Sequence, residues 1–398
     1  MRILHTSDWH IGRKLKDKDR SDEFIKFFKW LNDLISSEKI DVLLVAGDIF
    51  DNTTPSIQAQ NIYYSFLTEL AKSSCRHCVI ISGNHDSPAF IDAPSGLLKY
   101  LNIHVVGRTN ITDEVIKLQD PDLIVCAVPY LRDRDVREAN DEINSIDEAL
   151  KQGISKHYET IFYLAKRLQA GSNIPIIAMG HLFARGGRVK QDDGTRSLYV
   201  GTSIEIGSEI FPDDITYTAL GHLHSPQIIG GRENVRYSGS PLAMGFGEAG
   251  TQKAVCIIDI DANNNLTVKD FPVPEFQKIN RVSGDIQEIA KALKYYASMK
   301  ESIWLDVTYT GNERIGDLAE RLNNFTQNYP YIEILSVHNE GGRSNNKLES
   351  DSIPETLENI SPVKMFEMCL ESNNIPEEQQ KIFMPLYQEI LHEMGINY

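Results

Sequence analysis

Short apolar runs that end in a glycine and a polar side chain constrain this sequence more than any other feature. The clearest run is Val79–Ile81, which leads into Gly83-Asn84-His85-Asp86. Its β-branched residues predict a strand that is buried on both faces, and Gly83 is expected to allow a backbone conformation that other residues resist. Open α/β sheets bind ligands at the carboxyl ends of their strands, so Asn84 and His85 lie where a site is expected. Taken alone, the motif is equally consistent with a turn that carries a surface histidine.

The same arrangement recurs at four other places in the chain. The motifs are Asp8-Trp9-His10, Gly47-Asp48-Ile49-Phe50-Asp51, Gly180-His181 and Gly221-His222-Leu223-His224, each after an apolar run. A capping aspartate or a surface histidine would explain any one of them. However, five of the 11 histidines fall in these motifs, and parallel strands meet at one edge of a sheet. We therefore expect the five motifs to form one site.

The segments between the motifs predict an α/β fold. Helices expected over 21–37 and 54–72 separate the first three strands, which gives a parallel βαβαβ arrangement. Residues 141–170 predict a helix with a break at Gly153. Further strands are expected at 103–106, 123–128, 235–238, 254–260 and 266–271. The last three of these are predicted to belong to a second sheet, with Asn263-Asn264-Asn265 as the turn of its hairpin.

The pattern changes after Pro274, and the predicted boundaries follow from that change. Residues 1–274 would form the main domain and 275–338 a smaller α/β domain. Residues 339–361 are rich in Gly, Ser, Asn and acidic residues, which is typical of a linker. Residues 362–398 carry Ile382, Leu386, Ile390 and Met394 on one helical face. This tail either folds back on the body or docks on a partner helix, and we favour docking because a linker is an unusual way to reach the chain's own core.

Composition excludes several classes of protein. No run approaches the roughly 18 apolar residues of a membrane span. Residues 2–7 already predict a strand, so we expect no signal peptide and a cytoplasmic location. Five cysteines in 398 residues do not form a disulfide framework. Cys75 and Cys78 form a C-x-x-C pair without a second pair nearby, so a zinc or redox site there is the lesser alternative.

The net charge of −16 is unusual for an enzyme that acts on nucleic acid, because such enzymes commonly show a basic footprint. The charge is uneven, since residues 339–398 contain four basic and eleven acidic residues. Basic residues cluster beside the motifs at 13–20, 132–137 and 185–190, either as solvated loops or as contacts for an anionic substrate. Bound divalent cations would also make the site itself positive.

The polar side chains of the motifs are oxygen and imidazole ligands without thiolates. This set suits Mn, Fe or Zn better than a calcium cage. Seven candidate ligands exceed the needs of one ion and suit two ions that share a bridging carboxylate and a bridging water. The sequence lacks a G-x-x-x-x-G-K-[ST] loop, so ATP binding by a P-loop is not expected.

The order D-x-H, G-D-x-x-D, G-N-H-D, G-H, G-H-x-H resembles that of the calcineurin-like metallophosphoesterases over about residues 1–272. The segments MRILHTSDWHIGR, AGDIFD, SGNHDSP and GLLKYLNIHVVG are more similar still to the bacterial SbcD nuclease subunits, and this resemblance spans nearly the whole chain. It implies a two-sheet sandwich flanked by helices (α/β/β/α), a smaller capping domain at 275–338 and a helical tail.

The resemblance also implies roles for individual residues. The first metal ion would be held by Asp8, His10, Asp48 and His224, and the second by Asp48, Asn84, His181 and His222. His85 would protonate the leaving oxygen or orient the phosphate. Asp51 would orient His85, and Asp86 would stabilise the turn.

The implied activity is that of a DNA nuclease with two Mn²⁺ ions. Such proteins degrade duplex ends 3′ to 5′, cut single strands and open hairpins in DNA repair and recombination. Residues 362–398 would bind the coiled-coil base of an SbcC-type ABC ATPase, and the chain would form a homodimer within a heterotetramer. An alternative on the same fold is a small-substrate phosphatase or cyclic-nucleotide phosphodiesterase, which would act on a mononucleotide but not on DNA. A non-enzymatic adaptor with structural metals is less consistent with the complete ligand set and the additional His85.

Overall fold

The computed structural model describes residues 1–136, 146–189, 192–193, 195, 204–313 and 315–341, together with tail residues 363, 366, 370, 380, 383–387 and 391. Two compact units are present, Met1–Gly342 and Arg343–Tyr398.

The first sheet has six strands and contains the three opening motifs. Its strands are β1 (Arg2–Thr6), β2 (Val42–Ala46), β3 (His77–Ile81), β4 (Ile103–Val106), β11 (Ala254–Ile260) and β12 (Leu266–Pro272), in the order β12-β11-β1-β2-β3-β4. The strands β1 to β4 pair in parallel, as their crossover helices require. Helices α1 (Ser21–Ser37) and α2 (Ile57–Leu70) make those crossovers and bury apolar residues in one core with this sheet.

The second sheet also has six strands and contains the last two motifs. Its strands are β5 (Val115–Leu118), β6 (Leu123–Ala127), β7 (Ile176–His181), β8 (Tyr217–Gly221), β9 (Gln227–Ile229) and β10 (Arg232–Tyr237), in the order β5-β6-β7-β8-β10-β9. Helix α6 (Ile146–Gln169) packs on its outer face through Ile154, Tyr158 and Ile161.

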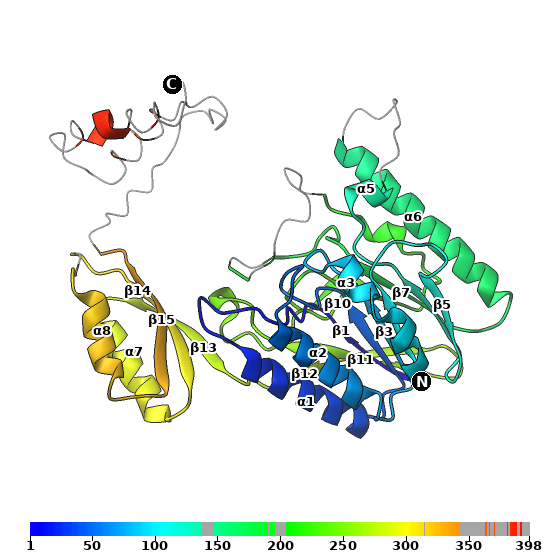
Figure 1. Ribbon diagram of the computed structural model, residues 1–398, viewed down its shortest axis with the longest axis horizontal. Helices are drawn as coiled ribbons and strands as arrows, with labels where there is room; N and C mark the ends of the chain where they lie inside the picture. Colours follow the sequence, from blue (N-terminus) through cyan, green and yellow to red (C-terminus); the bar gives the residue numbers. More distant parts are fainter. Residues whose placement is uncertain are drawn as a thin grey trace. The chain divides into compact units, whose positions relative to one another are not determined.

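The two sheets pack face to face, with helices on both outer sides (Figure 1). A separate core of apolar side chains lies between the sheets and includes Leu44 and Val79 from one sheet and Val125 and Met179 from the other. The predicted α/β/β/α sandwich is therefore confirmed. The remaining short helices are α3 (Pro88–Asp92), α4 (Ser95–Leu98), η1 (Lys99–Leu101), α5 (Asp133–Val136), η2 (Ser208–Ile210) and η3 (Phe246–Glu248).

The sheet to which strands β11 and β12 belong differs from the expected one. The sequence placed them in a second sheet together with residues 235–238, but β11 pairs antiparallel with β1 in the first sheet. Only β10 belongs to the second sheet, where it pairs with β8. The hairpin between β11 and β12 forms as predicted, with Asn264 in a left-handed conformation at φ 63°. Local patterns identify strands but do not reveal a pairing between residues about 255 positions apart, such as Ile3 and Ile258.

One predicted helix start and one predicted helix break are also wrong. Helix α2 begins at Ile57, and Ser56 caps it by accepting a hydrogen bond from the Ala59 N–H, whereas the sequence predicted a helix from residue 54. Helix α6 continues through Gly153 without a break. The glycine is needed because a Cβ there would lie 2.2 Å from the Val136 carbonyl oxygen. Residues 141–145 of the predicted helix lie outside the described part.

The smaller α/β part contains a three-stranded parallel sheet. Strands β13 (Lys278–Gly284), β14 (Ile303–Tyr309) and β15 (Ile332–Asn339) alternate with helices α7 (Ile286–Met299) and α8 (Leu318–Thr326). Ile279 and Trp304 of this sheet pack with Leu15 and Phe246 of the larger part. We call β13–β15 with α7 and α8 the capping part.

The tail is described only at scattered residues, and the predicted linker 339–361 lies almost entirely outside them. Within the tail, the rings of Phe366 and Tyr387 stack at 4.0 Å, and Leu370 and Leu391 are buried. Among the described residues, none of the helices combines the length and the hydropathy that crossing a bilayer requires.

Candidate metal centre

All seven predicted ligands lie at or directly after the carboxyl ends of strands. Asp8 and His10 follow β1, Asp48 follows β2, and Asn84 follows β3. His181 is the last residue of β7, and His222 and His224 follow β8. The ligands therefore come from both sheets, and the site is built where two sheet edges meet. The sequence predicted one shared edge, because the assignment of β7 and β8 to a separate sheet was not visible.

Asp48 occupies the centre of the site. Its Oδ1 accepts a hydrogen bond of 2.9 Å from the His85 backbone N–H. Its Oδ2 lies 3.6 Å from His10 Nε2 and 3.4 Å from His181 Nε2. One carboxylate oxygen is thus held by the backbone, while the other faces imidazoles from both halves of the ligand set. A carboxylate that bridges two cations requires this position.

The first group of converging ligand atoms belongs to Asp8, His10 and His224. The Nε2 atoms of His10 and His224 are 3.1 Å apart. His224 Nδ1 lies 2.7 Å from the Asp193 carbonyl oxygen, to which it donates, so a neutral ring presents the lone pair of Nε2 to the site. Asp8 is held by the His222 N–H at 2.9 Å and the Ser7 hydroxyl at 2.6 Å.

The second group belongs to Asp48, His181 and His222. His181 Nδ1 donates to the Ala46 carbonyl oxygen at 2.9 Å. Its Nε2 lies 3.0 Å from Asn84 Oδ1, which brings the amide of the fourth predicted ligand to the same point. Buried carboxylate and amide oxygens that converge with imidazole nitrogens fit divalent cations well. His10 Nδ1 adds a buried nitrogen without a hydrogen-bond partner among the described residues.

The backbone that carries these ligands is strained. Asp8, His10 and Asp48 have φ values of 53°, 50° and 50°, and His222 has a φ of 111°. Non-glycine residues rarely adopt positive φ, and such conformations cluster at functional sites. Four of the seven predicted ligands therefore have energetically unfavourable backbone conformations that the strands and helices themselves do not require.

Gly83 is required by a close approach and not by an unusual backbone angle. A Cβ at this position would lie 2.1 Å from Asp48 Oδ1, and the φ of Gly83 is not in the left-handed region. The sequence attributed Gly83 to conformational freedom, and this reason is wrong. Absence of a side chain there lets the loop after β3 reach the central carboxylate.

Burial and charge set the protonation of the ligands. Burial lowers the pKa of His10 and His222 well below the usual value and that of His224 to about 4, so these imidazoles are neutral. Burial raises the pKa of Asp8 to about 7. Burial also opposes charge on Asp48 and His181, but each stabilises the ion of the other. Their attraction holds the pKa of Asp48 well below its usual range and raises that of His181 to about 9, so a cation entering here displaces a proton.

His85, Asp51 and Asp86 surround this centre. The rings of His85 and His10 lie edge to face with centroids 4.7 Å apart. His85 Nδ1 lies 2.8 Å from the backbone carbonyl oxygen of Asp51, whereas the Asp51 carboxylate accepts from Arg13 at 3.0 Å. Asp86 stabilises the turn as predicted, because it accepts hydrogen bonds from the N–H groups of Ile49, Phe50 and Gly83.

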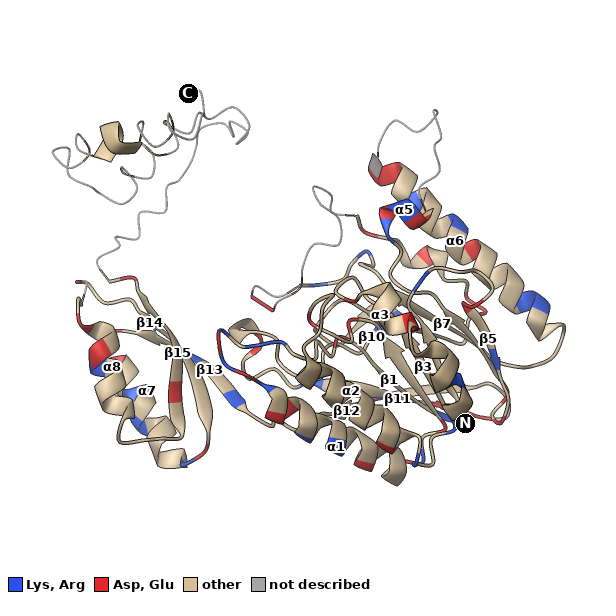
Figure 2. Ribbon diagram, viewed as in Figure 1, with Lys and Arg blue, Asp and Glu red and all other residues tan. Residues whose placement is uncertain are grey.

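The basic clusters divide into structural residues and residues near the centre. Arg20 is only 2% exposed and forms a bidentate pair with Glu23, while Lys18 pairs with Glu333 of β15. Arg132 donates to the Asp86 carbonyl oxygen at 3.2 Å, which places its guanidinium beside the loop of Asn84 and His85. Figure 2 shows acidic and basic segments mixed along α1 and α6. Arg20 and Lys18 thus pair with acidic residues of the fold, whereas Arg132 lies near the predicted ligands.

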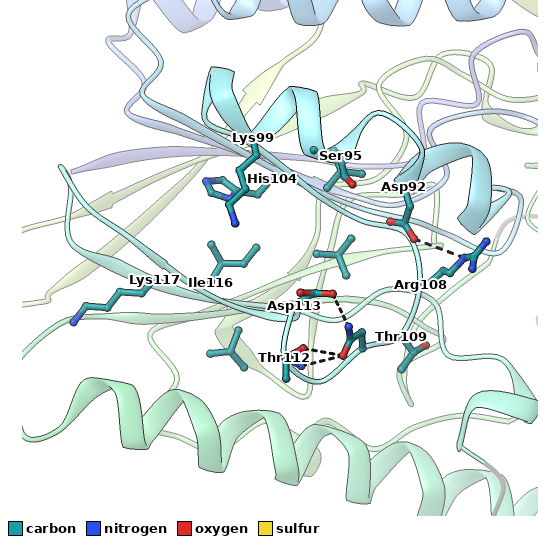
Figure 3. Close-up of a pocket in the computed structure, with 15 residues that line it drawn as sticks. Asp92, Ser95, Lys99, His104, Arg108, Thr109, Thr112, Asp113, Ile116 and Lys117 are labelled. Carbon is teal, nitrogen blue, oxygen red and sulfur yellow. Dashed lines mark hydrogen bonds and ion pairs between the residues drawn. The ribbon is translucent and has the colours of Figure 1, made fainter.

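Figure 3 shows a cavity of about 760 Å³ that is lined by residues between Asp92 and Lys117. It opens between η1 and the strands β4 and β5, and none of the seven predicted ligands lines it. Three of its charged residues already have partners, since Arg108 lies 3.9 Å from Asp92 and Asp113 accepts a hydrogen bond from Asn110. The size of a cavity therefore does not identify the site in this protein.

Comparison with known proteins identifies the family. The model of the calcineurin-like phosphoesterase family matches residues 1–226. Over 401 aligned residues the chain is 32% identical to the SbcD subunit of the SbcCD nuclease of Escherichia coli K12, with 99% of both chains covered. The chain belongs to the SbcD family of calcineurin-like phosphoesterases. The predicted resemblance is thus confirmed.

Other SbcD subunits are also similar to this chain. The SbcD subunit of the Bacillus subtilis SbcCD nuclease is 29% identical over 414 residues, with 99% of both chains covered. That of Rhodobacter capsulatus is 34% identical over 279 residues, which cover 65% of this chain and 66% of the relative. Residues 275–374 match a family model described as the type 5 capsule protein repressor C-terminal domain. The similarity to known proteins therefore extends through the capping part as well as the phosphoesterase part.

Sequence reasoning missed the residues that support the ligands. Asp193, Ser7 and the carbonyl of Ala46 each fix one ligand, but they lie outside the five motifs at the strand ends. Only the position of Ser7, directly before Asp8, offered a signal, because short polar side chains commonly bond to neighbouring groups.

Proposed function

We propose that this protein is the nuclease subunit of an SbcCD-type complex and hydrolyses DNA phosphodiester bonds with two Mn²⁺ ions. The observation that supports this most is the position of Asp48 Oδ2, 3.6 Å from His10 Nε2 and 3.4 Å from His181 Nε2. It occurs in a chain related over its full length to proteins named as nuclease subunits.

The proposed ligands divide between two ions. Asp8, His10, Asp48 and His224 would hold the first ion, and Asp48, Asn84, His181 and His222 the second. Two such ions, when bound by these residues, would supply a hydroxide nucleophile at neutral pH and would neutralise charge on the phosphate. The mixed nitrogen and oxygen set is consistent with manganese. The neutral amide of Asn84 limits the negative charge of the ligand set, which favours an anionic phosphodiester.

His85 is proposed to act on the phosphate without holding a metal. Its Nδ1 donates to the Asp51 carbonyl oxygen, so Nε2 faces the site and, in the imidazolium form of the ring, can donate to the leaving oxygen or to a phosphate oxygen. We propose that Asp51 orients His85 through this carbonyl. Its carboxylate lies 3.6 Å from His10 Nδ1 and is held by Arg13, which suggests a further role in orienting His10.

DNA is the proposed substrate, and the capping part is proposed to admit it. Residues 1–274 would form the nuclease domain and 275–338 the capping domain, working in the cytoplasm. Arg132, which lies beside the loop of Asn84 and His85, is our candidate for a phosphate contact. By similarity we propose 3′-to-5′ degradation of duplex ends and cleavage of single strands and hairpins.

Residues 362–398, after a linker at 339–361, are proposed to dock on the coiled coil of the ATPase. Phe383 and Leu386 are 40% and 53% exposed, which leaves apolar side chains for a partner helix. Removing residues 362–398 is expected to abolish ATPase binding in a pull-down while metal-dependent cleavage by the remaining chain persists. Retained binding would refute this docking assignment.

Helices α1 and α2 are the candidate surface for the proposed homodimer. A largely apolar groove of about 780 Å³ runs between them. Ile25 and Ile57 at this groove are 53% and 77% exposed. Light scattering of the wild type and of an Ile57→Glu variant tests this surface. We expect the wild type to be a dimer and the variant to be a monomer. A dimeric variant would contradict the assignment of this surface.

Cleavage of end-labelled duplex and hairpin DNA by the isolated protein tests the proposed activity. We expect products with Mn²⁺, fewer with Mg²⁺, and none with EDTA. Turnover of an aryl phosphodiester or a mononucleotide without cleavage of DNA would instead favour the small-substrate enzyme. Absence of turnover on every substrate despite bound Mn²⁺ would favour the non-enzymatic adaptor.

A further inference from the structure

A buried ion pair lies directly behind one of the proposed ligands. Lys253 and Glu248 are 5% and 0% exposed, and the Lys253 ammonium contacts Glu248 Oε1. Neither residue belongs to a motif or to the proposed ligand set. Burying two charges carries a large desolvation cost, so a buried pair calls for an explanation beyond stability.

The lysine is bonded to the backbone of His224. Lys253 Nζ donates to the His224 carbonyl oxygen at 3.0 Å and to Ser240 Oγ at 3.0 Å. The Ser240 N–H donates to the same carbonyl oxygen at 3.1 Å. On the other side of the residue, the ring of His224 is held by the Asp193 carbonyl oxygen. His224 is therefore fixed at two points, and Lys253 supplies one of them.

The glutamate links this lysine to the helix η3. Glu248 is the last residue of η3 and also accepts from the Met244 N–H at 2.7 Å. Phe246, in the same short helix, packs with Ile279 and Trp304 of the capping part. The Asp193 carbonyl, which is the second support of His224, is also linked to the capping part. Arg281 of β13 pairs with Asp192, the neighbour of Asp193. Both supports of His224 thus adjoin contacts of the capping part.

We propose that the Lys253–Glu248 pair positions His224 and thereby sets the affinity of the first metal ion. This inference rests on the proposed function, since it concerns a ligand of the proposed metal centre. The pair touches neither substrate nor metal, so both residues are positioning residues. The competing explanation is that the pair only stabilises the loop between Gly239 and Lys253.

The double substitution K253M/E248Q tests the proposal, because it removes both charges at nearly unchanged side-chain volume. Binding of Mn²⁺ to the full-length, metal-free protein is followed by calorimetry and by electron paramagnetic resonance. His224→Ala and His181→Ala, each expected to lose one binding step, assign the two steps. We expect the first ion to bind about tenfold or more weakly, with the second affected less than about twofold.

A second buried pair provides the matched control. Glu114 and His157 lie 2.6 Å apart with side chains 0% and 8% exposed, and neither is near a proposed ligand. The E114Q/H157N variant is expected to lower the melting temperature without changing Mn²⁺ affinity. Equal first-site affinity in K253M/E248Q and wild type would overturn the proposal, as would equal weakening of both sites in proportion to lost stability.

Ser240→Ala keeps the inference testable if the double variant does not fold. It removes the hydroxyl that accepts from Lys253 and that donates to the carbonyl oxygens of Leu242 at 2.9 Å and His224 at 3.4 Å. The Ser240 N–H bond to His224 is retained, so a smaller, first-site loss of affinity is expected. Unchanged first-site affinity in this folded variant would overturn the proposal. Failure of the wild type to bind Mn²⁺ would instead contradict the metal centre itself, and the two failures are therefore distinguishable.

Discussion

The phosphoesterase part and the capping part both contain parallel strands joined by helices, yet they use the ends of those strands differently. In the larger part, β1, β2, β3, β7 and β8 end in seven proposed ligands. In the capping part, the strands end at Gly284, Tyr309 and Asn339. Asn339 donates to the Ile315 carbonyl oxygen within its own part. The topology creates an edge where side chains can meet, and the residues at that edge decide whether it can bind metals.

Backbone strain separates the same two regions. Asp8, His10, Asp48 and His222 have positive φ in the larger part. The positive-φ non-glycine residue among the described residues of the capping part is Lys300, at the C-terminus of α7. Strain at a helix end is ordinary, whereas strain in four ligand positions is not. This difference distinguishes the site more sharply than cavity size does.

Asp48→Asn is the change expected to affect the larger part most. The amide preserves the shape of the side chain but removes the charge between the two groups of ligands. We expect both Mn²⁺ affinities to fall, and cleavage to fall well beyond the roughly 10- to 100-fold effect of changes outside the ligand set. Calorimetry and the DNA cleavage assay measure the two effects. Two ions bound with wild-type affinity would contradict the central role of Asp48.

His85→Gln separates metal binding from chemistry at the same edge. We expect both ions to remain bound, because His85 is not a proposed ligand. Cleavage is expected to fall by about 10²- to 10⁴-fold, the usual contribution of a proton-transferring side chain. Metal content and cleavage are measured on one preparation of the variant. Unchanged cleavage would remove the role proposed for His85.

The pH dependence of Mn²⁺ binding tests the electrostatics of the centre. Attraction to Asp48 raises the pKa of His181 to about 9 against the opposing effect of burial, so at neutral pH a metal ion displaces this proton. Apparent affinity should therefore rise with pH, by about tenfold per unit for one displaced proton. Below about pH 7, protonation of Asp8 should steepen the dependence. Calorimetry in buffers of different ionisation enthalpy counts the protons, and release of none would contradict this description.

Asn339→Ala changes a residue at the end of a strand in the capping part and is therefore the counterpart of the changes above. Of these variants, it is expected to affect metal binding least. It removes the hydrogen bond to the Ile315 carbonyl oxygen, at a cost of about 1 kcal/mol in the free energy of unfolding. Mn²⁺ affinity should remain within about twofold of wild type. Thermal unfolding and calorimetry measure the two quantities. A large loss of metal affinity would show that the two strand edges are less different than described.

The sequence predicted the elements and the order of the motifs better than it predicted their long-range relations. Apolar runs that end in Asp8, Asp48 and Asn84 are local features, and each does follow a buried strand. The pairing of β11 with β1 is not local, so the sheet to which β11 belongs was assigned wrongly. Close approaches are equally invisible, which explains both Gly153 and Gly83.

Within the site, the sequence indicated which side chains meet but not how they are held. Nothing in the D-x-x-D spacing shows that His85 bonds to the carbonyl of Asp51 while the carboxylate bonds to Arg13. Lys253 and Glu248 belong to no motif, and only the three-dimensional fold places them behind His224. Which residues support a ligand depends on distances between atoms in the folded protein, and a sequence pattern does not give these distances.

At Asp8, which has a left-handed backbone conformation, the proposed activity and the stability of the fold place opposite demands on the side chain. Asparagine tolerates this conformation, and it would also remove a carboxylate whose pKa burial raises to about 7. An Asp8→Asn protein is therefore expected to be inactive and yet, without metal, at least as stable as the wild type. Screening a library for thermal tolerance alone would enrich such inactive chains. In this protein, only a selection that demands the proposed cleavage activity would preserve the Asp8 carboxylate.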